Sequence, residues 1–205
     1  MKYNPDIHHR QSIRLKDFDY SSEGAYFITI CAEKQQCIFA SAIRRGDPCG
    51  HPNLYDEHEI ELTELGEICE NTFYDIEVRY NIFISKYVIM PNHIHFILII
   101  SNENTQSSNL SEMRRGDDPC GCPESDEDTR ATARVAPTVG SIVGGYKSLV
   151  ANVWLKKCKE NNISMGKIWE RNYYEHIIRD DQDYQIKWNY IDTNPINWDK
   201  DEYNS

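Results

Sequence analysis

The sequence predicts an α+β fold in which helices pack on one face of an antiparallel sheet. Segments with the alternation and composition of strands are mixed along the chain with segments that carry a helical stripe of apolar residues. Strands and helices in this mixed order are typical of an antiparallel sheet covered by helices. The chain has 205 residues, of which 40% are hydrophobic, so it suits a single domain with one core.

Four segments have the composition of strands. Each is rich in β-branched and aromatic residues, and together they comprise residues 24–32, 82–90, 93–100 and 168–179. Residues 37–40 form a further short candidate, which we expect to be the hairpin partner of the first strand. The strand that carries His93 and His95 is expected in the middle of the sheet.

Three segments have the periodicity of helices. Leu62–Ile76 places its apolar residues on one stripe, and Thr63 is the expected N-cap. Residues 138–157 form the second helix, although two adjacent glycines lower its helical propensity. Residues 181–194 form the last helix, which Pro195 ends. All three helices are expected on the same face of the sheet.

The composition limits the classes of function. The net charge of −11 argues against binding of duplex nucleic acid through bulk electrostatics. No apolar run is long enough to span a bilayer, and the polar N-terminus has no secretory signal, so we expect a cytoplasmic protein without membrane contacts. The seven cysteines are then expected to be reduced thiols.

A short peptide occurs twice, as RRGDPCGHP at residues 44–52 and as RRGDDPCGCP at residues 114–123. Both copies lie in polar segments without periodicity, which predict flexible insertions at residues 42–58 and 102–136. The first copy can be encoded by a short inverted repeat, GGTGACC and GGTCACC around CTTGC. One hypothesis is that both copies are translated palindromic DNA elements, and the alternative is an internal duplication that forms a binding loop. Zinc binding by Cys49, His51, Cys120 and Cys122 is disfavoured, because their spacing is not that of a zinc knuckle.

The sharpest chemical feature is the sequence His93-Ile94-His95. Residues two apart on a strand point to the same face, so both imidazoles are expected to project side by side. Two imidazoles at this spacing can bind one divalent cation. The alternative is that one ring is a satisfied polar group and the other is exposed to solvent.

The final helix supplies a second pair of candidates. Tyr190 and Asn194 are four residues apart and share a helix face. Asn194 has a carbonyl oxygen to offer a metal, while Tyr190 has a phenolic oxygen that a nearby cation would help to act as a nucleophile. The alternative is that Tyr190 packs in the core and Asn194 caps the helix before Pro195.

Several stretches together resemble the REP-associated tyrosine transposases, relatives of the single-tyrosine insertion-sequence transposases in the HUH nuclease superfamily. The resemblance is carried by KYVIMPNHIHFILII, WERNYYEHIIR and WNYIDTNPINW, and it extends over nearly the whole chain except the two insertions. It implies a ferredoxin-like or RRM-like α+β domain. It also implies a metal-dependent endonuclease and strand transferase (a transposase) that acts on single-stranded, hairpin-forming palindromic DNA through a 5′-phosphotyrosine intermediate, as a monomer or homodimer.

The resemblance also assigns roles by position. His93 and His95 match the metal-binding histidines, Tyr190 matches the nucleophile, and Asn194 matches a third, amide-type ligand. Imidazole and oxygen ligands suit Mg²⁺ or Mn²⁺. Weaker candidates for DNA contacts are Arg10, Arg14, Lys16, Lys147, Arg171, Asn172, Tyr173 and His176. The alternative function is a domesticated protein that binds DNA hairpins without cutting them.

Overall fold

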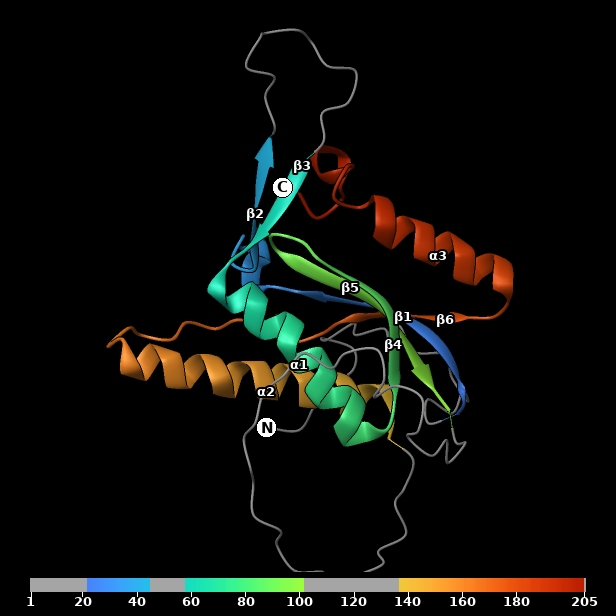
Figure 1. The fold of residues 1–205 in the computed structure, drawn as a ribbon, viewed down its shortest axis with the longest axis horizontal. Helices are drawn as coiled ribbons and strands as arrows, with labels where there is room; N and C mark the ends of the chain where they lie inside the picture. Colours follow the sequence, from blue (N-terminus) through green and yellow to red (C-terminus); the bar gives the residue numbers. More distant parts are fainter. Residues whose placement is uncertain (1–21, 45–57, 102–136, 205) are drawn as a thin grey trace, which may run out of the picture. The chain divides into compact units, whose positions relative to one another are not determined.

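A four-stranded antiparallel sheet is the main sheet of the described part of the chain (Figure 1). The structure, a computed structural model, describes residues 22–44, 58–101 and 137–204. The strands lie in the order β4-β5-β1-β6 and comprise β1 (Gly24–Cys31), β4 (Phe83–Ile89), β5 (His93–Ile100) and β6 (Tyr174–Ile178). The expected position of the histidine-bearing strand is confirmed, because β5 is one of the two inner strands.

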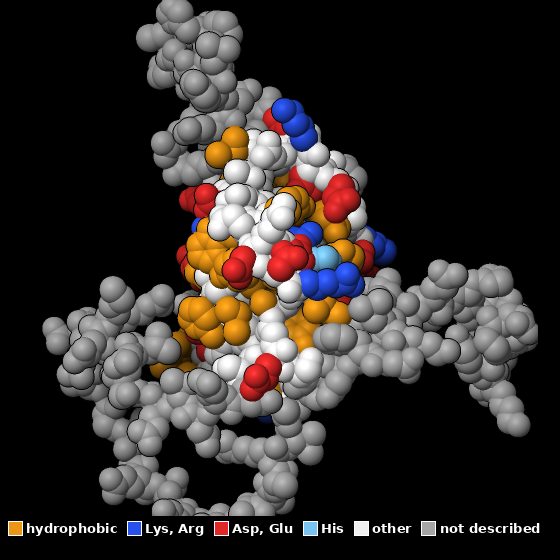
Figure 2. Space-filling model, turned by 90° about the vertical axis from the view of Figure 1, so that its right-hand side faces the viewer, with side chains coloured by type: hydrophobic (Ala, Val, Ile, Leu, Met, Phe, Trp, Pro, Cys, Tyr) orange, Lys and Arg blue, Asp and Glu red, His pale blue; other side chains and the backbone are white. Residues whose placement is uncertain are grey.

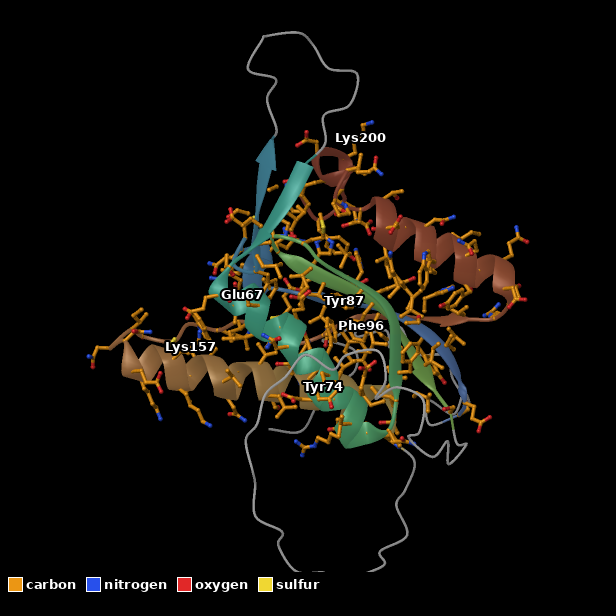
Figure 3. All side chains as sticks on the ribbon, viewed as in Figure 1. Glu67, Tyr74, Tyr87, Phe96, Lys157 and Lys200 are labelled. Atoms are coloured by element: carbon orange, nitrogen blue, oxygen red, sulfur yellow. The ribbon has the colours of Figure 1, made fainter. Side chains whose placement is uncertain are left out.

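Two helices cover one face of this sheet. They are α1 (Glu64–Tyr80) and α2 (Val139–Glu160), and they pack on inward-facing residues of the inner strands such as Ile28 and Phe96. Phe96 and Tyr87 are labelled in Figure 3, where Phe96 lies between the sheet and α1. The ring of Phe73 from α1 is 5.4 Å from that of Phe96 and 4.9 Å from that of Tyr146 in α2. This aromatic contact joins all three elements in one core.

The third helix, α3 (Asp181–Thr193), lies on the opposite face. Its Ile191 packs with Phe27 and Ile97, whose neighbours in sequence belong to the core on the other face. The α+β class is confirmed, but the expectation that all three helices share one face is wrong for α3. The physical reason is that Phe27 and Ile97 make the second face of the inner strands apolar as well. Packing of α3 on this face therefore removes apolar surface from water.

The helix termini follow the expected local chemistry. The hydroxyl of Thr63 accepts a hydrogen bond from the backbone N–H of Gly66 at 3.1 Å, so the predicted N-cap of α1 is confirmed. The helix α2 continues through Gly144 and Gly145 without a break. Gly145 faces the ring of Tyr80, which occupies the space that a Cβ atom would need. The glycine therefore serves close packing between α1 and α2.

The expected hairpin between strand 24–32 and residues 37–40 is wrong. Both edges of β1 are already occupied, by β5 and by β6. The next strand, β2 (Ala40–Arg44), pairs instead with β3 (His58–Leu62) in a separate two-stranded sheet. The ends of the predicted insertion 42–58 thus belong to this hairpin, while residues 45–57 and the insertion 102–136 lie outside the described residues, together with the cysteines considered for zinc.

The surface of the described part is mixed in charge. On the face shown in Figure 2, lysine and arginine side chains are interspersed with acidic and hydrophobic ones. Among the described residues, none of the helices has the length and apolar character that crossing a membrane would require.

Two glycines with different surroundings test the packing of the helices. A Cβ atom at Gly66 would clash with the backbone carbonyl oxygen of Phe39, which the Thr63 hydroxyl and N–H hold in place. Gly66→Ala is therefore expected to lower the free energy of unfolding by about 1–3 kcal/mol. Gly144→Ala is the matched control, because nothing lies within 4 Å of the position that its Cβ atom would occupy, and it should raise stability by about 0.5–1 kcal/mol. Urea unfolding of both variants measures the effect, and equal changes would contradict it.

Candidate metal and tyrosine site

His93 and His95 lie side by side on the face of β5 that α3 covers. Their ring centroids are 4.4 Å apart, and both side chains are fully buried. Ile94 between them points into the core on the other face. The strand alternation therefore produces the arrangement that the sequence predicts.

The Nδ1 atom of His93 has a neighbour that fixes its protonation. The amide nitrogen of Asn92 donates to the backbone carbonyl of Tyr203 at 2.6 Å, so its oxygen faces Nδ1 of His93 at 2.8 Å. This oxygen can only accept, and the Nδ1 atom of His93 must therefore carry the hydrogen. Nε2 of His93 is left with its lone pair, which is the form that binds a metal.

His95 has an equivalent partner on the neighbouring strand. Its Nδ1 atom lies 2.8 Å from the hydroxyl of Thr29, which is its register partner on β1. The Nε2 atoms of both histidines are buried and have no hydrogen-bond partner among the described residues. Because buried polar atoms are nearly always paired, two orphaned nitrogens side by side indicate a place for a ligand.

The helix α3 brings Tyr190 and Asn194 to these histidines. The ring of Tyr190 is 5.1 Å from that of His95 in an edge-on contact, and 37% of this tyrosine is exposed. Asn194 is buried and follows the last residue of α3. Its Oδ1 atom is a third buried atom without a hydrogen-bond partner in the described part of the chain. The structure thus brings together all four residues that the sequence singles out for the site.

Two residues beyond the final helix complete the site and were missed by the sequence analysis. The carboxylate of Asp201 accepts from the amide nitrogen of Asn194 at 2.8 Å, and its oxygen lies within 4.8 Å of the ligand atoms of His93 and His95. The ring of Tyr203 is 4.6 Å from that of His93. Neither residue belongs to a periodic segment of the sequence. The signal that could have pointed to them was the group of acidic residues that follows the final helix.

Burial sets the protonation of the site. It lowers the pKa of His93 to about 4, against the opposing effects of Asp201 and Asn194. Burial also lowers the pKa of His95, with further contributions from His93 and Lys187. Both imidazoles are therefore neutral at physiological pH, as metal binding requires. For Tyr190, burial and the charges of Asp201 and Glu202 raise the pKa to about 12, so its phenol keeps its proton unless a positive charge approaches.

These groups fit a divalent cation. The His93–His95–Asp201 group can hold a metal ion, and the unpaired Oδ1 atom of Asn194 offers a further oxygen. Nitrogen and hard oxygen donors in one buried cluster are the set expected for a first-row or alkaline-earth dication.

The weaker DNA-binding candidates are distributed differently. Arg10, Arg14 and Lys16 lie outside the described residues. The ammonium of Lys147 donates to the backbone carbonyls of Glu170 and Asn172 at 3.0 Å, and burial lowers its pKa to about 8. The imidazole of His176 pairs with Asp183 at 2.8 Å and links β6 to α3. Arg171 and Asn172 have exposed side chains, and Tyr173 packs against the main core.

The lowered pKa values of the histidines predict an acid-sensitive fold in the absence of metal. Below the ordinary pKa of 6.5, the unfolded chain binds protons that buried His93 does not bind until about pH 4. The stability contributed by neutral His93 is therefore present above pH 6.5 and is lost as the pH falls toward 4. Urea unfolding in chelator should show a shallower loss over this range for His93→Gln than for the wild type. Parallel pH profiles would contradict the assignment.

Comparison with known proteins identifies a relative in sequence and a neighbour in fold. No family model matches the chain. An uncharacterized protein of Haemophilus influenzae is 36% identical over 202 residues, which cover 98% of this chain and 96% of that protein. A solved structure of a REP-associated tyrosine transposase bound to a REP hairpin matches with a TM-score of 0.50 and 16% identity, covering 92% of this chain and 74% of that one. The chain therefore belongs to the same family as the Haemophilus influenzae protein, and it has the fold of the REP-associated tyrosine transposase.

Proposed function

We propose that this protein is a metal-dependent transposase-like enzyme that cleaves and joins single-stranded DNA at hairpin-forming repeats. One observation carries the proposal. Nε2 of His93, Nε2 of His95 and Oδ1 of Asn194 are buried without hydrogen-bond partners in the described part of the chain, and the ring of Tyr190 lies 5.1 Å from that of His95. The structural neighbour, a transposase bound to a REP hairpin, supports DNA hairpins as the substrate class.

The residues that would hold the cation are His93, His95 and Asn194, with the Asp201 carboxylate as a fourth donor. Mg²⁺ or Mn²⁺ suits this set, because the oxygens are hard ligands and the imidazoles tolerate either ion. When bound, the ion supplies Lewis acidity toward a phosphoryl oxygen. Thr29 and Asn92 would orient the two imidazoles through their Nδ1 atoms, as partners of ligating histidines commonly do.

Tyr190 is the proposed nucleophile. Its phenolic oxygen would form a bond to phosphorus, the bond from phosphorus to the 3′ oxygen would break, and the strand would leave as a free 3′-hydroxyl after taking up a proton. The joining step reverses this exchange with another 3′-hydroxyl, so no external energy source is needed. The pKa of about 12 means that the phenol must lose its proton during the attack rather than before it.

Other tyrosines fit this role less well. Tyr184 lies six residues before Tyr190 and packs with Trp188 at a ring distance of 6.0 Å. Tyr173 and Tyr174 come from the segment of β6, on the far side of β1 from His95. Tyr203 is the strongest rival, because its ring also contacts His93.

A hairpin-binding protein without cleavage is the second candidate. The specific observation in its favour is Asp201, whose carboxylate already engages the Asn194 amide and lies beside the histidines. Its charge also raises the pKa of Tyr190, after the larger effect of burial, which opposes phenolate formation. The two candidates differ in one measurable product, the covalent protein–DNA adduct.

Tyr190→Phe separates these candidates. The change removes one oxygen from a partly exposed ring, so the fold and hairpin binding should survive while the adduct disappears. The measurement is a denaturing gel of the full chain incubated with labelled hairpin DNA from its own genome and Mn²⁺ or Mg²⁺. Tyr203→Phe and Tyr184→Phe are the matched controls and should retain the adduct. An adduct that persists in Tyr190→Phe would assign the chemistry to another tyrosine, and a wild type without any adduct would favour the binding protein.

Substitutions at the proposed metal ligands and at their hydrogen-bond partners should weaken metal binding to different degrees. His95→Ala should abolish cation-dependent cleavage but leave hairpin binding largely intact. Thr29→Val removes only the hydrogen bond to Nδ1 of His95 and should weaken Mn²⁺ binding by roughly 10- to 100-fold. Thr29→Ser keeps the hydroxyl and should bind nearly as the wild type does. Calorimetric titration measures the Mn²⁺ affinity of each variant, and the gel assay measures cleavage by His95→Ala. Unchanged Mn²⁺ affinity in His95→Ala would refute the proposed site.

A further inference from the structure

Lys187 lies on α3 three residues before Tyr190, so the two side chains share a helix face. Its Nζ atom is 5.0 Å from the centroid of the Phe27 ring. The same ring is 5.2 Å from the ring of His95 and 5.9 Å from that of Tyr190. One aromatic ring on β1 therefore joins the lysine, the histidine and the tyrosine in a single cluster.

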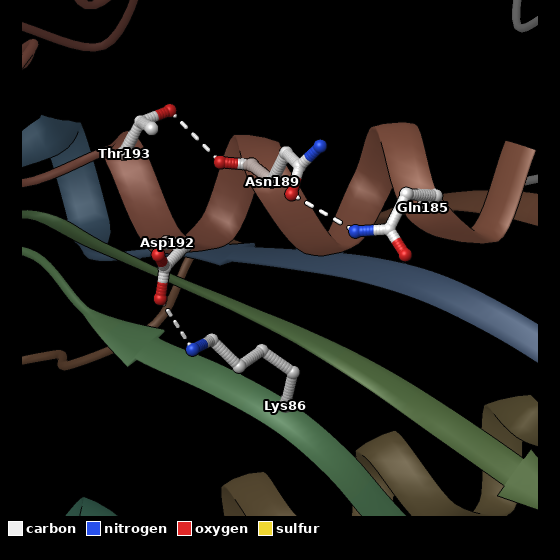
Figure 4. Close-up of polar contacts among 5 residues, drawn as sticks. All are labelled: Lys86, Gln185, Asn189, Asp192 and Thr193. Atoms are coloured by element: carbon white, nitrogen blue, oxygen red, sulfur yellow. Dashed lines mark hydrogen bonds and ion pairs between the residues drawn. The ribbon is translucent and has the colours of Figure 1, made fainter.

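Lys187 forms no salt bridge with a described residue, although its side chain is partly buried and it interacts electrostatically with Asp183, four residues earlier on α3. Lys86 on β4 makes the contrast. Its Nζ atom also lies over an aromatic ring, that of Trp188 at 4.9 Å, but it is paired with Asp192 at 2.5 Å (Figure 4). Both lysines thus lie over aromatic rings, but among the described residues only Lys86 is held in a salt bridge, while Lys187 interacts with Asp183 without one.

The charge of Lys187 also acts on the metal site. The ammonium of Lys187 adds to the burial and the His93 contribution that lower the pKa of His95. On the other side, Asp201 and Glu202 place negative charge near Tyr190, as their effect on its pKa shows after that of burial. A phosphodiester that enters beside Tyr190 would meet these two acids, and Lys187 is the cation placed to offset them.

We propose that Lys187 binds a non-bridging oxygen of the phosphodiester that Tyr190 attacks, an inference that rests on the proposed function. Lysine suits this task, because its ammonium is a compact charge on a flexible stem and binds phosphate as a point charge. Lys187 transfers no proton in this scheme. It stabilises negative charge on the phosphoryl oxygens while the bond to Tyr190 forms and the bond to the 3′ oxygen breaks. The Phe27 ring, which also contacts His95 and Tyr190, holds the ammonium near the site through its π face.

Three variants isolate the charge. Lys187→Met keeps a side chain of similar length without the charge, Lys187→Arg keeps the charge, and Lys86→Met removes the lysine that is paired with Asp192 as a matched control. The first measurement is the affinity of the full chain for a short oligothymidylate and for the genomic hairpin over a series of salt concentrations. Lys187→Met should reduce the slope of log affinity against log salt by roughly 0.7, the value for one lost phosphate contact on a single strand. Lys187→Arg and Lys86→Met should keep the wild-type slope.

The second measurement is the rate of adduct formation on the hairpin. Lys187→Met should slow it by about 100-fold, as expected for the loss of one charge-stabilising group, and Lys187→Arg should recover most of the rate. An unchanged salt slope in Lys187→Met would overturn the proposal, whether or not the wild type cleaves DNA. Equal losses in Lys187→Met and Lys86→Met would also overturn it, because the effect would then be structural. A changed slope with no adduct in the wild type would keep the phosphate contact and reject the cleavage function.

Discussion

The burial of two imidazoles side by side on an inner strand is the constraint on which this part of the structure depends. A buried polar ring costs free energy unless its nitrogens are paired. The Nδ1 atoms of His93 and His95 meet this requirement through Asn92 and Thr29, whereas their Nε2 atoms have no partner among the described residues. The sheet thus holds two lone pairs in a fixed direction, and the C-terminal segments cover them.

The two faces of the sheet differ in composition: one carries the main apolar core, and the other carries the candidate site. The face under α1 and α2 is a continuous apolar core, in which Phe73, Phe96 and Tyr146 join the sheet to both helices. The face under α3 has a much smaller apolar cluster around Phe27, Ile97 and Ile191. Because the larger core carries most of the apolar burial, the second face can hold buried polar atoms that have no hydrogen-bond partner among the described residues.

Charges of opposite sign lie near the site. Asp201 lies against the histidines and raises the pKa of His93, while Lys187 lowers that of His95, in both cases beside the larger effect of burial. A cation added between the ligand atoms would balance the acid, and a phosphate added beside it would balance the lysine. Under the proposed function, a cation and a phosphodiester would together give partners to the buried atoms that have none among the described residues.

The sequence by itself determined much of the local structure and singled out four residues of the candidate site. Alternation placed His93 and His95 on one face, and helical spacing placed Tyr190 near Asn194, because both relations depend only on the repeat of one element. Tertiary structure alone decided that α3 covers the face opposite α1, that Asp201 and Tyr203 reach the histidines, and that Lys187 lies over Phe27. These contacts join residues far apart in the chain, and they depend on which strand edges and sheet faces remain free once the core has formed.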